Sequence, residues 1–370
     1  MLGIKNLNLV IFGIGNVGGT LVEQINAARP KLEAQHLKLN IPVVTNSRLA
    51  FFINSEDTNN WECDFENCSV PYNIQDIIDF VHNKKLDNLI AVDATASRDL
   101  VNHYELLVKS GFHIVSANKI ANTLSYDFYE SLRATLKAHN KYFMYETNVG
   151  AGLPVIETVR RLYGSGEEIK KIRGVFSGSL SYIFNAFSDE NIPFSKVLKQ
   201  ALDLGLTEPD AREDLSGNDV ARKLLILARE LNLKPEIKDI RIESLVPKQL
   251  NGKTTLHQFN TRIGELDGQF LDIKSKQSPG HVLRYVGELD VAKNTLEVKL
   301  VSEAKNSSIG QLKGADSVFE IYSDSYNEFP LVIRGAGAGK NVTARGLLCD
   351  IIKLSESLSS NPVCLSAVGN

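Results

Sequence analysis

The chain has 370 residues, of which 43% are hydrophobic and 23% are charged, as is usual for a globular protein of two or three domains. Its formal net charge of −3 argues against a nucleic-acid partner, because phosphate binding needs a basic patch. No apolar run is long enough to span a membrane, and the N-terminus does not resemble an export signal, so no membrane partner and a cytoplasmic location are expected.

The first predicted element is a buried strand at residues 8–12, which leads through a glycine-rich turn into a helical pattern at residues 20–28. The turn has the spacing GxGxxG at Gly13, Gly15 and Gly18. In a strand–turn–helix unit the first glycine permits the tight turn, the second lets the backbone approach a pyrophosphate, and the third lets helix and strand pack closely. The motif predicts dinucleotide binding, and a glycine turn without a ligand is the alternative.

The second predicted strand, near residues 37–44, bears on which dinucleotide is bound. An NAD site usually has an acidic residue at the end of this strand, where it holds the ribose hydroxyl. No acid occurs from Leu37 to Arg48, and Arg48 could instead meet a 2′-phosphate. The sequence therefore favours NADP(H), with NAD(H) also accepted, while an ordinary surface arginine is the alternative interpretation of Arg48.

Strands and helices alternate up to residue 146, which predicts an α/β fold with a Rossmann-type, doubly wound parallel sheet. Within this region residues 61–71 are expected to be irregular. Thr95, Ser97 and Lys119 each follow a predicted buried strand. Ligands bind at the carboxyl ends of strands in such sheets, so these side chains are candidates for the cofactor site. A surface lysine is the alternative for Lys119.

The segment from Glu146 to Pro154 contains two glycines and predicts an unusual backbone. Such a segment could turn its carbonyl groups inward onto a hard cation, with the Glu146 carboxylate supplying charge, because oxygen ligands suit alkali and alkaline-earth ions. A hinge at which the chain crosses between domains is the alternative.

The stretch from Gly205 to Lys223 is dense in ionisable side chains and runs into an amphipathic helical pattern. A polar loop that leads into a rigid helix is typical of a substrate site, whereas a solvated loop is the plainer interpretation. Asp219 and Lys223 are spaced i, i+4, so an ordinary surface ion pair is a further alternative for these two residues.

The later residues predict a second, α+β domain built on a mostly antiparallel sheet. Residues 283–302 alternate around a turn and predict a hairpin, and Gly335, Gly337 and Gly339 precede a helical run at residues 342–354. That last helix could add a phosphate contact, return the chain to the first domain, or both. The predicted division is an NAD(P)-binding domain at residues 1–150, completed by 335–358, a substrate, catalytic and dimerisation domain at 151–334, and a C-terminal tail at 359–370.

Eight stretches together resemble the homoserine dehydrogenase family, in the family's order. They are GIGNVGG at 13–19, TNSR at 45–48, VDATAS at 92–97, SANK at 116–119, YETNVGAGLPVIE at 145–157, GVFSGSLSYIFN at 174–185, LGLTEPDAREDLSGNDVARK at 204–223 and PLVIRGAGAGKNVTARG at 330–346. The resemblance implies the reversible, NAD(P)H-dependent reduction of L-aspartate 4-semialdehyde to L-homoserine, a step toward threonine, methionine and isoleucine. A short, monofunctional form is expected, without the aspartate kinase or the regulatory domain found in some members.

The resemblance also implies roles for individual residues. The residues implied to bind the cofactor are Gly13, Gly15, Asn16, Val17, Gly18, Arg48, Thr95, Ser97, Lys119, Gly205 and Gly339. The substrate would be held by Glu208 and Asp219 with Asp214 nearby, while Lys223 would donate the proton with Lys119 as its partner. The main-chain oxygens of Glu146, Val149, Ala151 and Leu153 would surround a monovalent cation, usually sodium. Ile120 and Leu206 depart from the family pattern, where a second lysine and a tyrosine are frequent.

The chemistry agrees with these implied roles. Reduction of an aldehyde needs a hydride at carbon and a proton for the developing alkoxide. A lysine can supply the proton, and two ammonium groups close together lower each other's pKa toward a useful range. A homodimer is expected, because a twofold partner would cover an exposed face or edge of the antiparallel sheet.

Two other functions are weighed against this one. Aspartate-semialdehyde dehydrogenase needs a nucleophilic cysteine, and none of the four cysteines (Cys63, Cys68, Cys349 and Cys364) lies in a site motif. A non-catalytic NAD(P)-binding sensor would keep the glycine turn without needing the polar stretch at residues 205–223. Binding of the cofactor without aldehyde-dependent oxidation would identify such a sensor.

Overall fold

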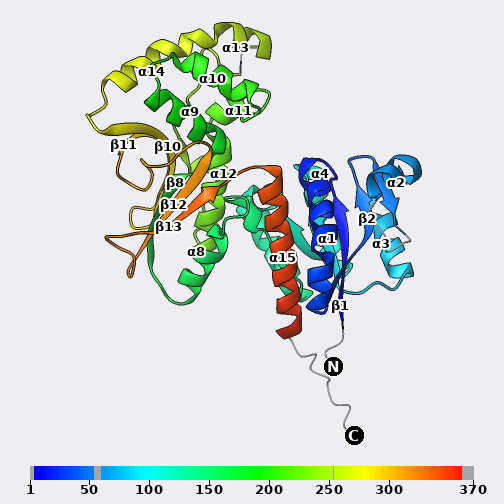
Figure 1. Ribbon diagram of the computed structural model, residues 1–370. Helices are drawn as coiled ribbons and strands as arrows, with labels where there is room; N and C mark the ends of the chain where they lie inside the picture. The colour runs from blue at the N-terminus through cyan, green and yellow to red at the C-terminus, as the bar shows by residue number, and fades with distance from the viewer. Residues whose placement is uncertain (1–3, 54–59, 253, 361–370) are drawn as a thin grey trace. The chain divides into compact units, whose positions relative to one another are not determined.

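The computed structural model describes residues 4–53, 60–252 and 254–360, which fold as two compact units (Figure 1). Within these ranges unit 1 contains the residues up to Ala121, Asp127–Thr147 and the chain from Thr343 onward. Unit 2 contains Asn122–Tyr126 and Asn148–Val342. Cys364 and the last ten residues of the predicted tail lie outside the described residues. No described helix has both the length and the apolar character to cross a membrane.

Unit 1 is built on a seven-stranded sheet of order β4-β3-β2-β1-β5-β6-β7. Five strands run parallel, and β3 and β4 add an antiparallel edge. The prediction of a Rossmann-type parallel sheet is therefore confirmed. The strands are β1 Lys5–Phe12, β2 Leu37–Thr45, β3 Leu49–Phe52, β4 Val70–Pro71, β5 Leu89–Asp93, β6 His113–Ser116 and β7 Phe143–Met144.

One local prediction in unit 1 is wrong, and one predicted helix is longer than expected. Residues 61–71 are not irregular, because Trp61–Cys68 forms helix α2, which buries Trp61 and Phe65 one turn apart, and β4 follows it. The helix predicted at residues 20–28 spans Asn16–Ala34 as α1 and continues through Pro30. A proline inside a helix costs about 3 kcal/mol, and burial of Leu32 beyond it helps to offset that cost.

The last helix, α15 Lys340–Ser360, belongs to the core of unit 1 from Thr343 onward. Its buried residues Ala344, Leu347 and Ile351 share one hydrophobic core with Leu21 and Ile25 of α1, beside which α15 runs (Figure 1). The remaining helices of this part of the chain are α3 Ile74–Asn83, α4 Arg98–Asn102, α5 Tyr104–Lys109, α6 Ile120–Thr123 and α7 Tyr126–Ala138.

Unit 2 is built on a six-stranded sheet of order β13-β12-β8-β10-β11-β9. All of its strand pairs are antiparallel except that of β9 with β11, and β10 and β11 form the predicted hairpin. The second, mostly antiparallel sheet is thus confirmed. The strands are β8 Ile169–Val175, β9 Arg241–Ile242, β10 His281–Asp290, β11 Thr295–Ala304, β12 Asp316–Ser323 and β13 Leu331–Ala336.

Helices of unit 2 pack against one face of this sheet. A Cβ atom at Gly287 of β10 would lie 3.1 Å from the Phe176 ring and 3.2 Å from Val220 of α12, so the absence of a side chain lets this helix approach closely. The helices of this part are α8 Val155–Gly164, α9 Gly178–Asp189, α10 Phe194–Asp203, α11 Ala211–Leu215, α12 Asn218–Glu230, α13 Leu256–Arg262 and α14 Leu266–Ser275. Short 3-10 helices lie at Glu146–Asn148, Ile237–Asp239 and Ile263–Glu265.

Candidate active site

The glycine turn after β1 has a separate steric reason for each of its glycines. Gly13 has φ +89°, and a Cβ atom there would lie 2.5 Å from the Thr95 methyl group. A Cβ atom at Gly18 would lie 1.9 Å from the Gly13 carbonyl oxygen, whereas one at Gly15 would meet no protein atom within 4 Å. Packing inside the protein thus requires Gly13 and Gly18, while Gly15 leaves the space that the backbone needs to approach a phosphate.

The turn is fixed to the neighbouring strand and ends at a helix N-terminus. The backbone N–H groups of Gly13 and Ile14 donate to the Thr45 carbonyl at the end of β2, at 2.8 and 3.1 Å. Helix α1 begins at Asn16, with Gly15 as a cap that has no side chain to satisfy the first N–H groups. Gly15, Asn16 and Val17 therefore form an N-terminus suited to a pyrophosphate, which fits a dinucleotide.

Arg48 lies in the tight turn between β2 and β3. The side-chain oxygen of Asn46 accepts hydrogen bonds from the backbone N–H groups of Arg48 and Leu49, at 2.8 and 2.7 Å. These bonds fix the turn, and the Arg48 side chain is exposed. It is thus a cation at the carboxyl end of the second parallel strand.

The carboxylate of Asp93 organises the carboxyl end of β5, and the sequence did not single it out. It accepts hydrogen bonds from the backbone and hydroxyl of Thr95, the hydroxyl of Tyr104 and the amide of Asn118, at 2.6–3.0 Å. Burial raises the pKa of Asp93, and the hydrogen bonds from Tyr104, Thr95 and Asn118 oppose that rise. An acid at the end of an otherwise apolar strand, in the sequence LIAVD, was the signal that could have revealed it.

Ser97 lies in the loop after β5, and Lys119 lies in the loop after β6. Ser97 caps α4 by accepting from the Leu100 N–H at 3.2 Å, and its carbonyl accepts from the Asn118 amide at 2.9 Å. Lys119 is half-buried and directly follows Asn118. The structure thus places Gly13, Thr95 and Ser97 close to one another at the carboxyl edge of the unit 1 sheet.

In unit 2 the amine of Lys223 is buried and paired. Its Nζ atom lies 2.8 Å from a carboxylate oxygen of Asp219 and donates to the Phe176 carbonyl at 2.7 Å. The Lys223 residue is 8% exposed, whereas the Asp219 side chain is 47% exposed. An ordinary surface ion pair does not describe a lysine whose amine is buried and also held by a carbonyl group.

The start of α12, which presents Lys223, is set by a glycine. Gly217 has φ +77°, and a Cβ atom there would lie 2.2 Å from the Tyr285 hydroxyl. That hydroxyl donates to the Glu243 carbonyl at 2.7 Å and is therefore not easily displaced. Gly217 thus lets the helix begin against β10 with Asp219 in its first turn.

Asp214 connects the charged loop to the start of α9. One of its oxygens accepts from the Ser179 hydroxyl at 2.6 Å, and the other accepts from the Glu208 backbone N–H at 2.9 Å. The Glu208 side chain is exposed, as is Gly205, which has φ +65°. Asp214 thus fixes the loop that carries Glu208, and the sequence had not identified Ser179.

Arg212 fastens the same loop on its other side. Its guanidinium pairs with Asp210 at 2.6 Å and donates to the Thr254 carbonyl at 2.8 Å. This pairing lowers the pKa of Asp210, with the Arg212 side-chain hydrogen bond as the main cause.

The predicted cation ligands fall on an unusual backbone. Gly150 and Ala151 both have positive φ, at +80° and +53°, which is uncommon for alanine. The Leu153 N–H donates to the Gly150 carbonyl at 3.0 Å. Glu146 belongs to unit 1, whereas Val149, Ala151 and Leu153 belong to unit 2. Among the described residues no three His, Cys, Asp or Glu side chains form a metal cluster, and a site of main-chain carbonyls would not need one.

One more predicted residue, Gly339, and the predicted pair of lysines remain to be placed. Gly339 has φ +115° and lies between β13 and α15, in the part of unit 2 that precedes the return to unit 1. Lys119 belongs to unit 1 and Lys223 to unit 2.

The sheet order, the glycine turn and the side chains at the strand ends define a two-domain α/β protein with a Rossmann-type dinucleotide-binding unit. The sequence matches two family models. "Homoserine dehydrogenase, NAD binding domain" covers residues 13–146, and "Homoserine dehydrogenase" covers residues 154–352. The chain belongs to the homoserine dehydrogenase family, which is a family of NAD(P)-dependent oxidoreductases.

Curated relatives agree with this assignment. A homoserine dehydrogenase from Paracoccidioides brasiliensis is 34% identical, over 96% of this chain and 99% of that protein. A bifunctional aspartokinase/homoserine dehydrogenase from Buchnera aphidicola is 37% identical over 94% of this chain. The chain spans 43% of the length of that bifunctional relative and of the one from Haemophilus influenzae.

Solved structures show the same fold. A Candida auris protein of unknown function is 31% identical with a TM-score of 0.87, covering 95% of this chain and 99% of its own. A putative homoserine dehydrogenase from Archaeoglobus fulgidus is 23% identical with a TM-score of 0.76, covering 94% and 99%. A hyperthermophilic archaeal homoserine dehydrogenase, 22% identical, was solved in complex with NADPH, with a TM-score of 0.72, covering 95% and 98%.

Proposed function

We propose that the chain catalyses the reversible, NAD(P)H-dependent reduction of L-aspartate 4-semialdehyde to L-homoserine. The observation that carries this proposal is the buried amine of Lys223, held by Asp219 and the Phe176 carbonyl on a helix that the family model covers. A proton donor needs a fixed position within reach of the group that it protonates. The contacts with Asp219 and the Phe176 carbonyl fix the amine of Lys223, and membership of the family supports the reaction.

In this proposal Lys223 gives a proton to the oxygen of the aldehyde as that oxygen becomes an alkoxide. When bound, the nicotinamide supplies the hydride for the aldehyde carbon. The carboxylate of Asp219 stabilises the ammonium before the transfer, and Lys223 takes the proton back from the hydroxyl group in the reverse direction. Lys119 serves as the partner of Lys223, a role that rests on the family resemblance.

The proposed substrate contacts use the charged loop of unit 2. Glu208 and Asp219 bind the amino group of the substrate, because carboxylates form charge-assisted hydrogen bonds with an ammonium group. Asp214 holds the Glu208 backbone and thereby sets the position of that residue. The substrate carboxylate needs donors, for which Lys119 and the backbone N–H groups of residues 177–181 are the candidates.

We propose unit 1 as the NAD(P)-binding domain and favour NADP(H). Gly13, Gly15, Asn16, Val17 and Gly18 would hold the pyrophosphate, while Arg48 would contact the 2′-phosphate. Thr95, Ser97 and Lys119 would lie along the rest of the cofactor, and Gly205 and Gly339 would border it. The exposed guanidinium of Arg48, at the end of a strand without an acid, supports the preference for NADP(H).

We also propose that main-chain oxygens of Glu146, Val149, Ala151 and Leu153 bind a monovalent cation, with sodium as the expected ion. The consecutive positive φ values at Gly150 and Ala151 support this proposal, because they give the segment a backbone in which carbonyl groups do not follow helix or strand. A cytoplasmic location of the protein stays a prediction.

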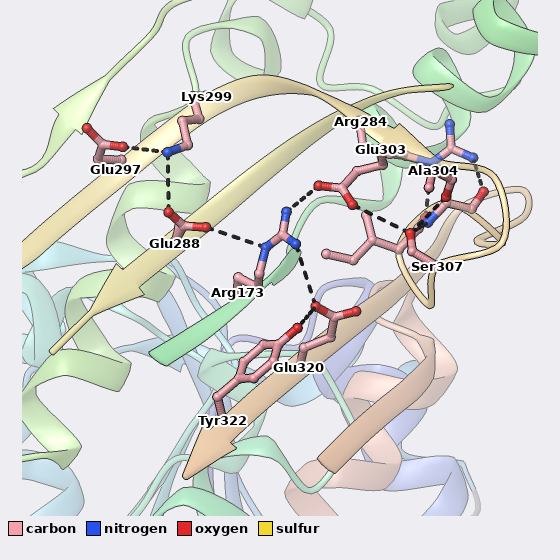
Figure 2. Close-up of polar contacts among 12 residues, drawn as sticks. Arg173, Arg284, Glu288, Glu297, Lys299, Glu303, Ala304, Ser307, Glu320 and Tyr322 are labelled. Carbon is pink, nitrogen blue, oxygen red and sulfur yellow. Dashed lines mark hydrogen bonds and ion pairs between the residues drawn. The ribbon is translucent and has the colours of Figure 1, made fainter. Parts of the chain in front are cut away.

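A homodimer is proposed through the face of the unit 2 sheet that lies opposite α12. This face holds a polar cluster in which Arg173 pairs with Glu288, Glu303 and Glu320, and Lys299 pairs with Glu288 (Figure 2). Val332 pairs with Glu320 across β12 and β13 and is 42% exposed. Polar groups that are already paired, next to the exposed apolar side chain of Val332, suit a surface that a second copy covers. Sedimentation equilibrium should therefore give the mass of two chains.

The first experiment follows absorbance at 340 nm with L-homoserine and either NADP⁺ or NAD⁺, with and without sodium or potassium. Cofactor reduction that requires homoserine is the expected result, and the ratio of the two rates tests the role of Arg48. Stimulation by one of the two ions would support the cation site. A folded chain that binds NADPH but shows no reaction in either direction would contradict the enzyme and favour a non-catalytic sensor.

A further inference from the structure

The buried carboxylate of Asp93 lies where three segments meet at the carboxyl edge of the unit 1 sheet. The segments are the end of β5 with its following loop, the loop after β6, and helix α5 with Tyr104. The Asp93 residue is 1% exposed, and the mechanism above gives it no role. A buried carboxylate in such a place calls for a reason, because burying a charge is costly.

Each oxygen of this carboxylate accepts two hydrogen bonds. Oδ1 accepts from the backbone N–H and the hydroxyl of Thr95, at 2.8 and 2.7 Å. Oδ2 accepts from the Tyr104 hydroxyl at 2.6 Å and from the Asn118 side-chain amide at 3.0 Å. A backbone N–H and an amide NH₂ can only donate, so both oxygens must act as acceptors, as they do in an ionised carboxylate.

The bonds continue from Asp93 to residues that the proposed function uses. The Thr95 hydroxyl accepts from the Ser97 N–H at 3.0 Å, and the Asn118 amide also donates to the Ser97 carbonyl at 2.9 Å. The Asn118 side-chain oxygen accepts from the Ile120 N–H at 3.1 Å. Lys119 therefore lies between two residues that are held by hydrogen bonds, Asn118 and Ile120.

A neutral side chain of the same shape could not make these contacts. An asparagine at position 93 has one acceptor oxygen and one NH₂ group, so it would turn its NH₂ group toward a donor of either Thr95 or Asn118. No cationic side chain pairs with Asp93 in the described part of the chain, so an ion pair is not the reason for its charge. The negative charge lets both oxygens of Asp93 accept hydrogen bonds, so that one side chain holds the loop after β5 and the loop after β6.

We propose that Asp93 is a positioning residue for the cofactor, which acts through Thr95 and Asn118 to hold the two loops that carry Thr95, Ser97 and Lys119. This inference deepens the proposed function and rests on it. Asp93 itself touches neither the substrate nor the reacting atoms. Asp93 holds the two loops in the conformation that binds the cofactor, so binding of NADPH does not have to order them.

The test is Asp93→Asn, measured by fluorescence titration with NADPH and by steady-state kinetics. The Kd and the KM for NADPH are each expected to be about tenfold higher than in the wild type. The NH₂ group of the new asparagine would face a hydrogen-bond donor of Thr95 or Asn118, and this conflict would displace one of the two loops. The KM for the aldehyde should stay within about twofold of the wild-type value. Such a split between the two KM values does not follow from a general loss of stability.

The matched control is Tyr104→Phe, which removes one hydrogen bond to the same carboxylate and leaves its bonds to Thr95 and Asn118. It should lower the thermal midpoint and leave the Kd for NADPH within about twofold. An unchanged Kd in Asp93→Asn overturns the proposal. So does a Tyr104→Phe variant that binds NADPH as weakly as Asp93→Asn, because the effect would then be general.

If Asp93→Asn does not fold, Asn118→Ala takes its place, since it removes the link from Asp93 to the second loop. A raised KM for NADPH with an unchanged KM for the aldehyde is again expected. If both KM values of Asn118→Ala equal those of the wild type, the proposal is contradicted. The titration with NADPH does not depend on turnover. A wild-type chain that binds NADPH without reducing the aldehyde therefore refutes the proposed reaction, separately from the role of Asp93 in binding.

Discussion

The carboxyl edge of the unit 1 sheet and the charged stretch of unit 2 are both polar, but they are built in different ways. At the unit 1 edge the backbone sets the shape, through Gly13 and Gly18, and one buried carboxylate, Asp93, ties the loops together. In unit 2 the stretch is organised by charge pairs at the start of α11 and on α12, where Arg212 pairs with Asp210 and Lys223 pairs with Asp219. Changes at the first region should therefore act through shape and changes at the second through charge.

The largest effect is expected from Lys223→Ala, which tests the charge side of this comparison. Loss of the proton donor should lower kcat by about 10²-fold or more, because general acid catalysis contributes that much. Steady-state assays of aldehyde reduction would measure it, with NADPH binding as a check on folding. Arg222→Ala is the matched control, because Arg222 is the exposed neighbour on the same helix, and it should keep nearly full activity. Similar losses in both variants would argue for a general effect of charge on α12.

The shape side is tested by two alanines in the glycine turn. Gly18→Ala should lower the free energy of unfolding by on the order of 3 kcal/mol, because its Cβ atom would lie 1.9 Å from a backbone oxygen. Gly15→Ala meets no protein atom within 4 Å, so its stability should change by less than about 1 kcal/mol while NADPH binding weakens. Urea unfolding and NADPH titration measure the two quantities. Equal stability of both variants would show that the turn has relaxed.

Acid should distinguish the two units through His113. Burial, assisted by the charge of Lys141, lowers the pKa of His113 from 6.5 to about 4, and its ring accepts from the Tyr142 N–H. Because the folded-state pKa is the lower one, the unfolded chain binds the extra proton, so stability is fully present above pH 6.5 and is lost as the pH falls toward 4. The loss is on the order of 3 kcal/mol. The lowered pKa of Asp210 in unit 2 acts only at lower pH, below the ordinary aspartate value of 3.8.

The measurement is urea unfolding at pH 7 and pH 4.5, followed by the fluorescence of Trp61, which is the single tryptophan of the chain and is buried in unit 1. His113→Asn, which keeps an acceptor for Tyr142, should make the midpoint less dependent on pH. His103→Asn is the control, because His103 is exposed, and it should behave as the wild type does. An unchanged pH dependence in His113→Asn would contradict the assignment.

The smallest effect concerns Arg48, the one exposed cation that unit 1 is proposed to use for recognition. Arg48→Ala should reduce the ratio of kcat/KM for NADPH to that for NADH by about tenfold, as expected for the loss of one charge-assisted contact at an exposed site. Lys31→Ala, at another exposed cation of unit 1, is the control and should leave the ratio unchanged. If the ratio survives in Arg48→Ala, the preference for NADP(H) is not set by this residue.

Local patterns of the sequence determined several features of this protein. The glycine fingerprint, the parallel alternation up to residue 146 and the β10–β11 hairpin each depend on residues near one another in the chain, where period and turn chemistry decide the outcome. The spacing of Asp219 and Lys223 likewise indicated their ion pair, because residues four apart face the same side of a helix.

Only the tertiary structure decided what those residues meet. The continuation of α1 through Pro30 and the formation of α2 depend on burial of Leu32, Trp61 and Phe65 in a shared core. The contact of Lys223 with the Phe176 carbonyl joins residues 47 apart, and that of Asp93 with Asn118 joins residues 25 apart. Periodicity cannot predict such pairings, because they arise from the packing of whole elements, and burial then turns an ordinary lysine or aspartate into a positioned one.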